Sequence, residues 1–155
     1  MKKIFVFFIT LFTFINANAQ WIRMLSEEDE MLEQESCEHF IYMSKEASFV
    51  FVDNNDILML TTNNGIFDYK SYGGIKNCTV LIGFYDNEMN LIEKKSVTFI
   101  SIRGDTLGVK DGKMKNKIID WLLLGNKVRF VADRYNRSKF DLTISENPYN
   151  GKEKY

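Results

Sequence analysis

The sequence predicts a mainly β, α+β domain: an antiparallel β-sandwich or strongly curved sheet with one packed helix near residues 112–124 and a C-terminal β-hairpin. Three observations support this fold class. Short apolar runs alternate with Asn, Asp and Gly turns from residue 40 onward. A helical spacing of apolar residues occurs near residues 112–124, and two segments that alternate between apolar and polar residues close the chain.

The N-terminus has the three parts of a cleavable secretory signal. Lys2 and Lys3 are followed by a mainly apolar stretch over 4–15, and Ala17-Asn18-Ala19 supplies small residues for cleavage before Gln20. This stretch is shorter than the roughly 20 residues that cross a bilayer. We therefore expect a signal peptide over 1–19 rather than a retained anchor, an exported protein that is periplasmic or secreted, and no transmembrane segment after cleavage.

The remaining chain predicts a single globular β-rich domain over 20–146 and a flexible polar tail over 147–155. We expect the acidic residues 20–36 to form a solvated segment. The signal contains two of the 20 basic side chains, which leaves 18 basic against 21 acidic ones. This weakly acidic balance argues against a nucleic-acid partner, because such binders usually have a basic surface.

Several short strands follow one another along the chain. Turn residues at 53–56, 63–65, 71–74 and 86–88 separate the predicted strands, which cover residues 49–52, 57–61, 66–69, 79–85 and 97–102. Residues 49–52 are apolar at every position, which is typical of a central strand. The order of strands and turns predicts antiparallel pairing.

One helix follows these strands. Asp111 or Gly112 begins it, and Gly125 stands where a C-terminal glycine is favoured. Apolar residues recur at helical spacing on one face, with Trp121 as the expected anchor against the sheet. They are Met114, Ile118, Ile119, Trp121, Leu122 and Leu123.

The last two strands, over 128–133 and 139–145, form the predicted hairpin with one apolar and one wet face. Basic residues and a tyrosine lie on its wet face and around its tip: Arg129, Arg134, Tyr135, Arg137 and Lys139. Arginine binds carboxylates and phosphates through two parallel hydrogen bonds, so this tip is a candidate binding site for an anion or glycan. The alternative is a solvated hairpin whose basic residues are balanced by Asp133 and Asp141.

Two cysteines, Cys37 and Cys78, predict a disulfide in an exported protein. His39 is the only histidine and would share a strand face with Cys37, about 6.5–7 Å away along the chain. That spacing is too long for direct proton transfer, so we expect no Cys/His nucleophile. Cys37, Cys78 and His39 are too few for a structural zinc site, and we expect no metal or other cofactor.

No catalytic or nucleotide-binding motif occurs, which favours a non-catalytic module over an enzyme. We expect an exported binding or accessory module that recognises a protein or glycan of the cell envelope. One alternative is an exported carboxylate-dependent hydrolase with acids converging near Tyr69, Tyr72 or Phe84. The other is a structural or assembly subunit that pairs through an exposed strand edge.

Short motifs spread over most of the chain also suggest a family: Trp21, Asp29-Glu30-Met31, residues 80–86, the helix with Trp121, and Phe140-Asp141-Leu142. In these the chain resembles small exported bacterial domains of the type VI-secretion accessory and invasion-associated locus B-like kind. The chain differs from that pattern in having Gly83 where those domains have a basic residue, and Tyr85 inserted before Asp86. The resemblance implies a β-sandwich accessory or binding domain without known catalysis.

Overall fold

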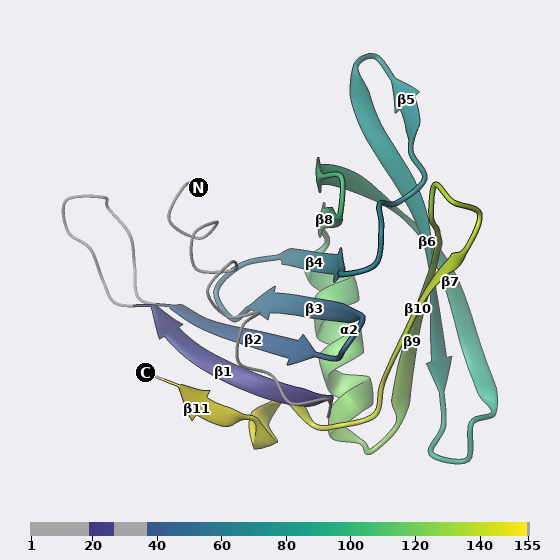
Figure 1. Cartoon of the computed structure of the whole chain (residues 1–155). Coiled ribbons are helices and arrows are strands. Elements are labelled where there is room, and N and C mark those ends of the chain that lie inside the picture. The colour runs from purple at the N-terminus through teal and green to yellow at the C-terminus, as the bar shows by residue number, and fades with distance from the viewer. Residues whose placement is uncertain (1–18, 27–36, 155) are drawn as a thin grey trace.

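A computed structural model of the chain describes residues 19–26 and 37–154 (Figure 1). The predicted signal peptide, apart from its last residue, and the acidic stretch over 27–36 lie outside the described residues. The strands are β1 (Gln20–Ser26), β2 (Cys37–Met43), β3 (Ala47–Val52), β4 (Ile57–Thr62), β5 (Lys70–Tyr72), β6 (Ile75–Tyr85), β7 (Leu91–Arg103), β8 (Thr106–Lys110), β9 (Lys127–Asp133), β10 (Lys139–Ile144) and β11 (Lys152–Lys154). The helices are α2 (Gly112–Leu123) and the 3₁₀ helix η3 (Pro148–Asn150).

All eleven strands belong to one sheet. Ten of them follow the order β10-β9-β6-β7-β8-β4-β3-β2-β1-β11, and β5 pairs with β6 outside this path. Every pair is antiparallel except β1 and β11, which run parallel. The prediction of a mainly β fold with one α-helix is confirmed for the part of the chain that the structure describes.

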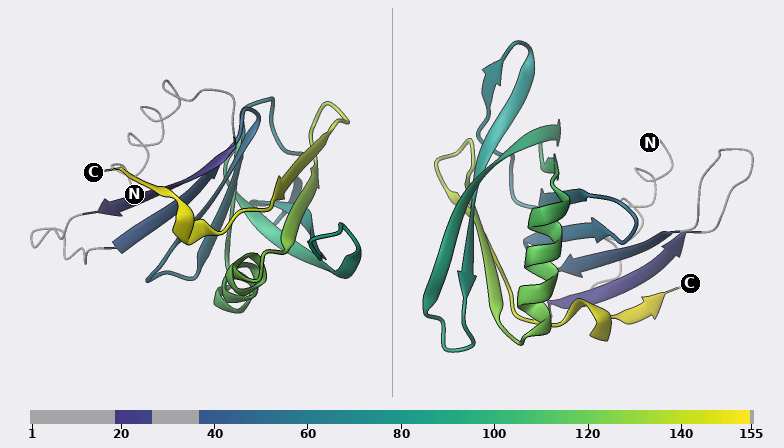
Figure 2. Two further views of the ribbon diagram at one scale, coloured as in Figure 1. Left: turned by 90° about the horizontal axis from the view of Figure 1, so that it is seen from below. Right: turned by 180° about the vertical axis from the view of Figure 1, so that it is seen from behind.

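The sheet is strongly curled, and its two halves share one core. Figure 2 shows the strands bending around α2, which lies on the concave side. Phe49 of β3 stacks on Phe130 of β9 with ring centroids 4.9 Å apart, although four strands separate β3 from β9 in the sheet. The contact requires the sheet to fold back on itself. A curved sheet, rather than two separate sheets, therefore describes the fold.

Strand β3 lies at the centre of this core. All six of its residues are buried, as the apolar run at 49–52 predicts. The side chains that face α2 belong to the main core, together with Trp21 and Phe40 from the neighbouring strands. A second, smaller cluster lies on the opposite face of β1–β4 and consists of Ile22, Met24, Ile41, Met43 and Val50, with Met59 packed against it. Alternation along each strand thus supplies apolar residues to both faces.

The predicted helix begins and ends close to the expected residues. The Asp111 side chain caps it by accepting a hydrogen bond from the Met114 N–H at 2.9 Å, and Gly125 adopts the left-handed conformation after its end. Trp121 donates to the Tyr85 carbonyl at 2.8 Å and packs edge-on against Phe84, which fastens the helix to the end of β6. Leu123 was expected on the buried face but is exposed.

A lysine takes one of the buried helix positions instead. Lys115 is almost fully buried, and its Nζ donates to the carbonyls of Val52, Asp53 and Asn55 at 3.3, 2.9 and 2.7 Å. An ammonium group has three donors, so these carbonyls match its capacity. Lys115 therefore ties the helix to the turn that follows β3, a role that the apolar periodicity of the sequence did not reveal.

The C-terminal hairpin is confirmed, with Lys139 paired to Asp133 across β9 and β10. Elsewhere the strands differ from the sequence prediction. β1, β2 and β8 were not predicted, and β7 is far longer than 97–102. The predicted strand over 66–69 reduces to a single bridge between Phe67 and Arg134, while β5 forms where a loop was expected. The acidic composition of residues 20–36 predicted a solvated segment, but Trp21, Ile22 and Met24 of β1 are buried. Burial of these apolar side chains places β1 in the sheet.

The residues expected to form a flexible tail over 147–155 are structured through Lys154. The side chain of Asn147 caps η3, and Tyr149 packs edge-on against Phe40 with ring centroids 5.1 Å apart. Gly151 then passes so close to Trp21 that a Cβ atom there would lie 3.0 Å from its side chain. This close approach lets β11 reach the edge of β1, whose backbone groups would otherwise lack partners.

Candidate functional site

Two of the five residues predicted at the hairpin tip are held in ion pairs within the hairpin. The Arg129 guanidinium binds the Asp141 carboxylate through two hydrogen bonds, of which the one from Nε is 2.8 Å long. Lys139 pairs with Asp133 across the same two strands. The aspartates that the sequence suggested as balancing charges are therefore direct partners. This leaves Arg134, Tyr135 and Arg137 at the tip.

The structure positions these three residues differently. The Arg134 guanidinium lies 5.9 Å from the centroid of the Phe140 ring, and its buried Nε has no hydrogen-bond partner among the described residues. Tyr135 is 74% exposed. Arg137 is also exposed and has φ of 66°, the left-handed conformation that is uncommon for residues other than glycine. The tip thus presents a tyrosine and two guanidinium groups on a tight turn.

Cys37 and Cys78 are not bridged, so the predicted disulfide is wrong for this structure. Cys37 begins β2, whereas Cys78 lies in β6 with its side chain in the main core. Burial raises the pKa of Cys78 to about 11, with further contributions from Asp133 and Asp68. A core position thus holds Cys78 as a protonated thiol at neutral pH.

The contact between Cys37 and His39 is closer than their spacing along the strand suggested. The Cys37 Sγ lies 3.4 Å from the His39 Nε2, within hydrogen-bond distance for sulfur. Their Cα atoms are two residues apart, but side chains on one face of a strand can lean toward each other. Burial lowers the pKa of His39, which favours a neutral imidazole.

A cavity of about 290 Å³ lies beside α2 and is open to solvent. Its lining residues are Asp53, Lys115, Asn116, Ile119, Asp120, Leu123 and Tyr149. The carboxylates of Asp53 and Asp120 line it, and a carboxylate-dependent hydrolase would need such a pair. The aromatic residues expected from the sequence beside the pair do not line this cavity. The Tyr69 hydroxyl donates to the Arg103 and Gly104 carbonyls, Tyr72 is exposed on β5, and Phe84 is covered by Trp121.

The largest unexpected feature is the hairpin of β6 and β7, here called the arm (residues 75–103). Figure 1 shows its β5 end projecting from the body of the molecule. Of the 13 residues of β7, only Phe99 is buried. Both strands carry exposed apolar side chains: Ile75, Leu81, Leu91, Ile92, Ile100 and Ile102.

One edge of the arm is open. β7 pairs with β6 along residues 91–100, but β8 is in register with β7 only at Ile100, Ser101 and Arg103. On the side away from β6, no described strand is therefore in register with residues 91–99. Sequence reasoning missed this edge because it assigned β7 to 97–102, the part that lies near β8.

Charged residues line the same part of β7. Glu93 is paired with Lys95 and with Lys117 of α2, and Lys117 also lies over the Phe84 ring, 4.7 Å from its centroid. These contacts lower the pKa of Glu93, first through the hydrogen bond from Lys117. Lys94 is exposed. Lysines on a free strand edge discourage non-specific strand pairing.

In residues 19–26 and 37–154, no group of three or more His, Cys, Asp or Glu side chains is placed to hold a metal ion. No helix of these segments is long and apolar enough to cross a membrane. Comparison of the chain with protein-family models, curated proteins and solved structures gave no match. The resemblance to small exported bacterial domains therefore stays a prediction.

Proposed function

We propose that the protein is an exported, non-catalytic module that binds an extended segment of a partner protein along the open edge of β7. The observation that carries the proposal is the side of residues 91–99 that pairs with no strand in the described part of the chain. Backbone N–H and C=O groups on a free edge can accept an additional strand, and alternate side chains then give specificity. The composition of residues 1–19 supports export to the periplasm or the cell exterior.

The surroundings of the edge fit a protein segment better than a glycan. Leu91 and Ile92 are exposed where the edge begins, and Ile100 is exposed where it meets β8. Apolar side chains on an added strand would cover them. Lys94 and Lys95 would favour a partner segment that also carries acidic residues.

The test is a photo-crosslinking amino acid placed at Ser96, an exposed position in the middle of the open edge. We expect a reproducible crosslinked protein from the envelope or medium fraction, identified by mass spectrometry. Hydrogen exchange should then show new protection of residues 91–99 in the complex. The matched control carries the same crosslinker at Asn136, an exposed residue of the hairpin tip.

A partner captured only from Asn136 would contradict strand addition and would favour the hairpin tip. No partner from either position would contradict a stable protein complex. Protection spread over the whole sheet, rather than over residues 91–99, would also contradict the proposal, because it would indicate stabilisation of the fold and not coverage of one edge.

A second candidate function is recognition of an anionic group by the hairpin tip, and the exposed Tyr135 and Arg137 on its turn favour it. A guanidinium group binds a carboxylate or phosphate through two parallel hydrogen bonds. Arg137→Ala should weaken binding to acidic glycans or peptides, and Arg134→Lys should do so while keeping the charge. A melting temperature near that of the wild type would show that both variants fold; unchanged affinity would remove the tip from consideration.

A further inference from the structure

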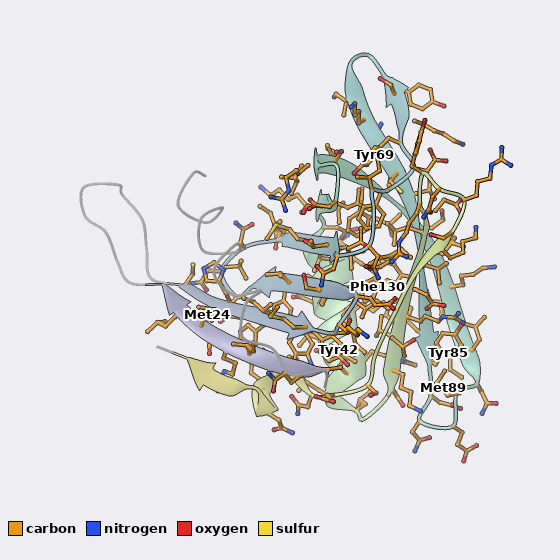
Figure 3. All side chains as sticks on the ribbon, viewed as in Figure 1. Met24, Tyr42, Tyr69, Tyr85, Met89 and Phe130 are labelled. Carbon is orange, nitrogen blue, oxygen red and sulfur yellow. The ribbon has the colours of Figure 1, made fainter. Side chains whose placement is uncertain are left out.

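Three sulfur- and nitrogen-bearing side chains lie together where β1 ends and β2 begins. Met24 is directly opposite His39 in the antiparallel register of these strands, and directly opposite residues lie on the same face. Cys37 is two residues from His39 and therefore also lies on that face. Figure 3 labels Met24 near the end of β1.

The distance between the thiol and the imidazole suits two ligands of one metal ion. Cys37 Sγ and His39 Nε2 are 3.4 Å apart. With metal–sulfur and metal–nitrogen bonds of about 2.3 and 2.0 Å, a tetrahedral angle places the two donor atoms about 3.5 Å apart. Only a small adjustment of the two side chains would let both bind the same ion.

Met24 contributes a third donor and indicates the class of metal. Met24 is the register partner of His39, and Cβ atoms of directly opposite residues are about 4.5–5.5 Å apart, so the flexible Met24 side chain is long enough to bring its sulfur to an ion bound by the imidazole. Met24 is buried with Ile22 and Ile41 in the smaller apolar cluster. A thioether is a soft ligand that favours Cu(I), whereas zinc sites use thiolate, imidazole and carboxylate.

We propose that Met24, Cys37 and His39 form a binding site for Cu(I). On binding, the Cys37 thiol releases its proton to solvent and the thiolate sulfur, the imidazole nitrogen and the thioether sulfur each donate an electron pair. The oxidation state of copper does not change. The site is separate from the open edge of β7, and the failure of either proposal leaves the other standing.

The test is an anaerobic titration of the purified, reduced protein with Cu(I) in competition with the chromophoric chelator bicinchoninate. We expect one Cu(I) per chain, and X-ray absorption should show two sulfur ligands and one nitrogen ligand. Cys37→Ser should abolish binding in this competition. Met24→Leu, which keeps the apolar volume, should weaken binding and remove one sulfur ligand. The matched control is Cys78→Ser, which removes the other thiol and should still bind one Cu(I).

The proposal is wrong if the wild type does not compete with the chelator, or if Cys37→Ser binds as tightly as the wild type. It is also wrong if Cys78→Ser loses binding while it remains folded by circular dichroism, or if Zn(II) displaces Cu(I). A Met24→Leu variant with unchanged affinity and an unchanged X-ray absorption spectrum would remove Met24 from the site and would leave no basis for a preference for Cu(I).

Discussion

β3 and β7 belong to one sheet and are both rich in apolar residues, yet their environments are opposite. β3 has β2 and β4 beside it over most of its length, and all six of its residues are buried. β7 extends beyond β8, and only Phe99 of its 13 residues is buried. The comparison shows that neighbouring elements, and not strand composition alone, decide which apolar residues stabilise the fold and which remain at the surface.

The largest expected effect is a difference in stability between the two strands. Phe49→Ala removes a fully buried ring that stacks on Phe130 and should cost about 3–5 kcal/mol. Ile100→Ala on β7 should cost about 1 kcal/mol or less, because half of that side chain is already exposed. Urea unfolding measures both values. Similar losses of stability for the two variants would show that the arm is covered in solution, and would contradict the difference in environment between β3 and β7.

The next effect concerns the turn that holds β3. Lys115→Met leaves three carbonyls without their shared donor, and we expect a loss of about 2 kcal/mol, as for hydrogen bonds to a charged group. Lys94→Met on β7 is the control and should leave stability nearly unchanged. Chemical unfolding of the two variants gives the difference; equal stability of Lys115→Met and wild type would show that the burial of Lys115 is not structurally important.

The buried thiol of Cys78 should make the free energy of unfolding depend on pH in the alkaline range. The pKa of Cys78 is raised from 9.0 to about 11, so the unfolded chain releases this proton at lower pH than the folded chain. Stability should therefore be unaffected below pH 9 and fall between pH 9 and 11, by about 1 kcal/mol at pH 10. Cys78→Val should flatten this part of the pH profile, measured by thermal unfolding. Tyr42, whose pKa burial raises to about 12, should continue the decline at higher pH in both proteins.

The smallest expected effect is at the contact between α2 and the arm. Lys117→Met removes the ion pair with Glu93, and because both side chains are partly exposed to solvent, the free energy of unfolding should change very little. Hydrogen exchange should nevertheless become faster in residues 91–95, because the pair fastens the start of β7 to the helix. Unchanged exchange there would show that Trp121 alone holds this end of the arm.

Local patterns in the sequence predicted the features that depend on neighbouring residues. The cap of Asp111, the helix stripe and the alternation in β9 and β10 lie where expected, because capping and alternation act within a few residues. The buried position of Lys115 could not be predicted in this way. It depends on three carbonyls about 60 residues earlier in the chain.

The candidate sites likewise divide into features that depend on neighbouring residues and features that depend on tertiary structure. The sequence identified the basic residues of the hairpin tip, and their alternation also suggested that Asp133 and Asp141 would balance them. It did not predict the open edge of β7. That edge exists because β8 pairs with β7 only at Ile100, Ser101 and Arg103, and the extent of pairing between two strands depends on tertiary structure. Nor did backbone spacing predict the contact between Cys37 and His39, since that contact depends on side-chain direction.

The parallel pairing of β1 with β11 joins the first strand of the domain to the last. More than 120 residues separate Ile22 from its register partner Lys152. The second neighbour of β1 is therefore absent until synthesis has passed residue 152, and contacts of such long sequence separation form slowly. A nascent chain that stops before residue 147 keeps one side of β1 unpaired. This dependence delays completion of this side of the sheet until residues 152–154 have been synthesised.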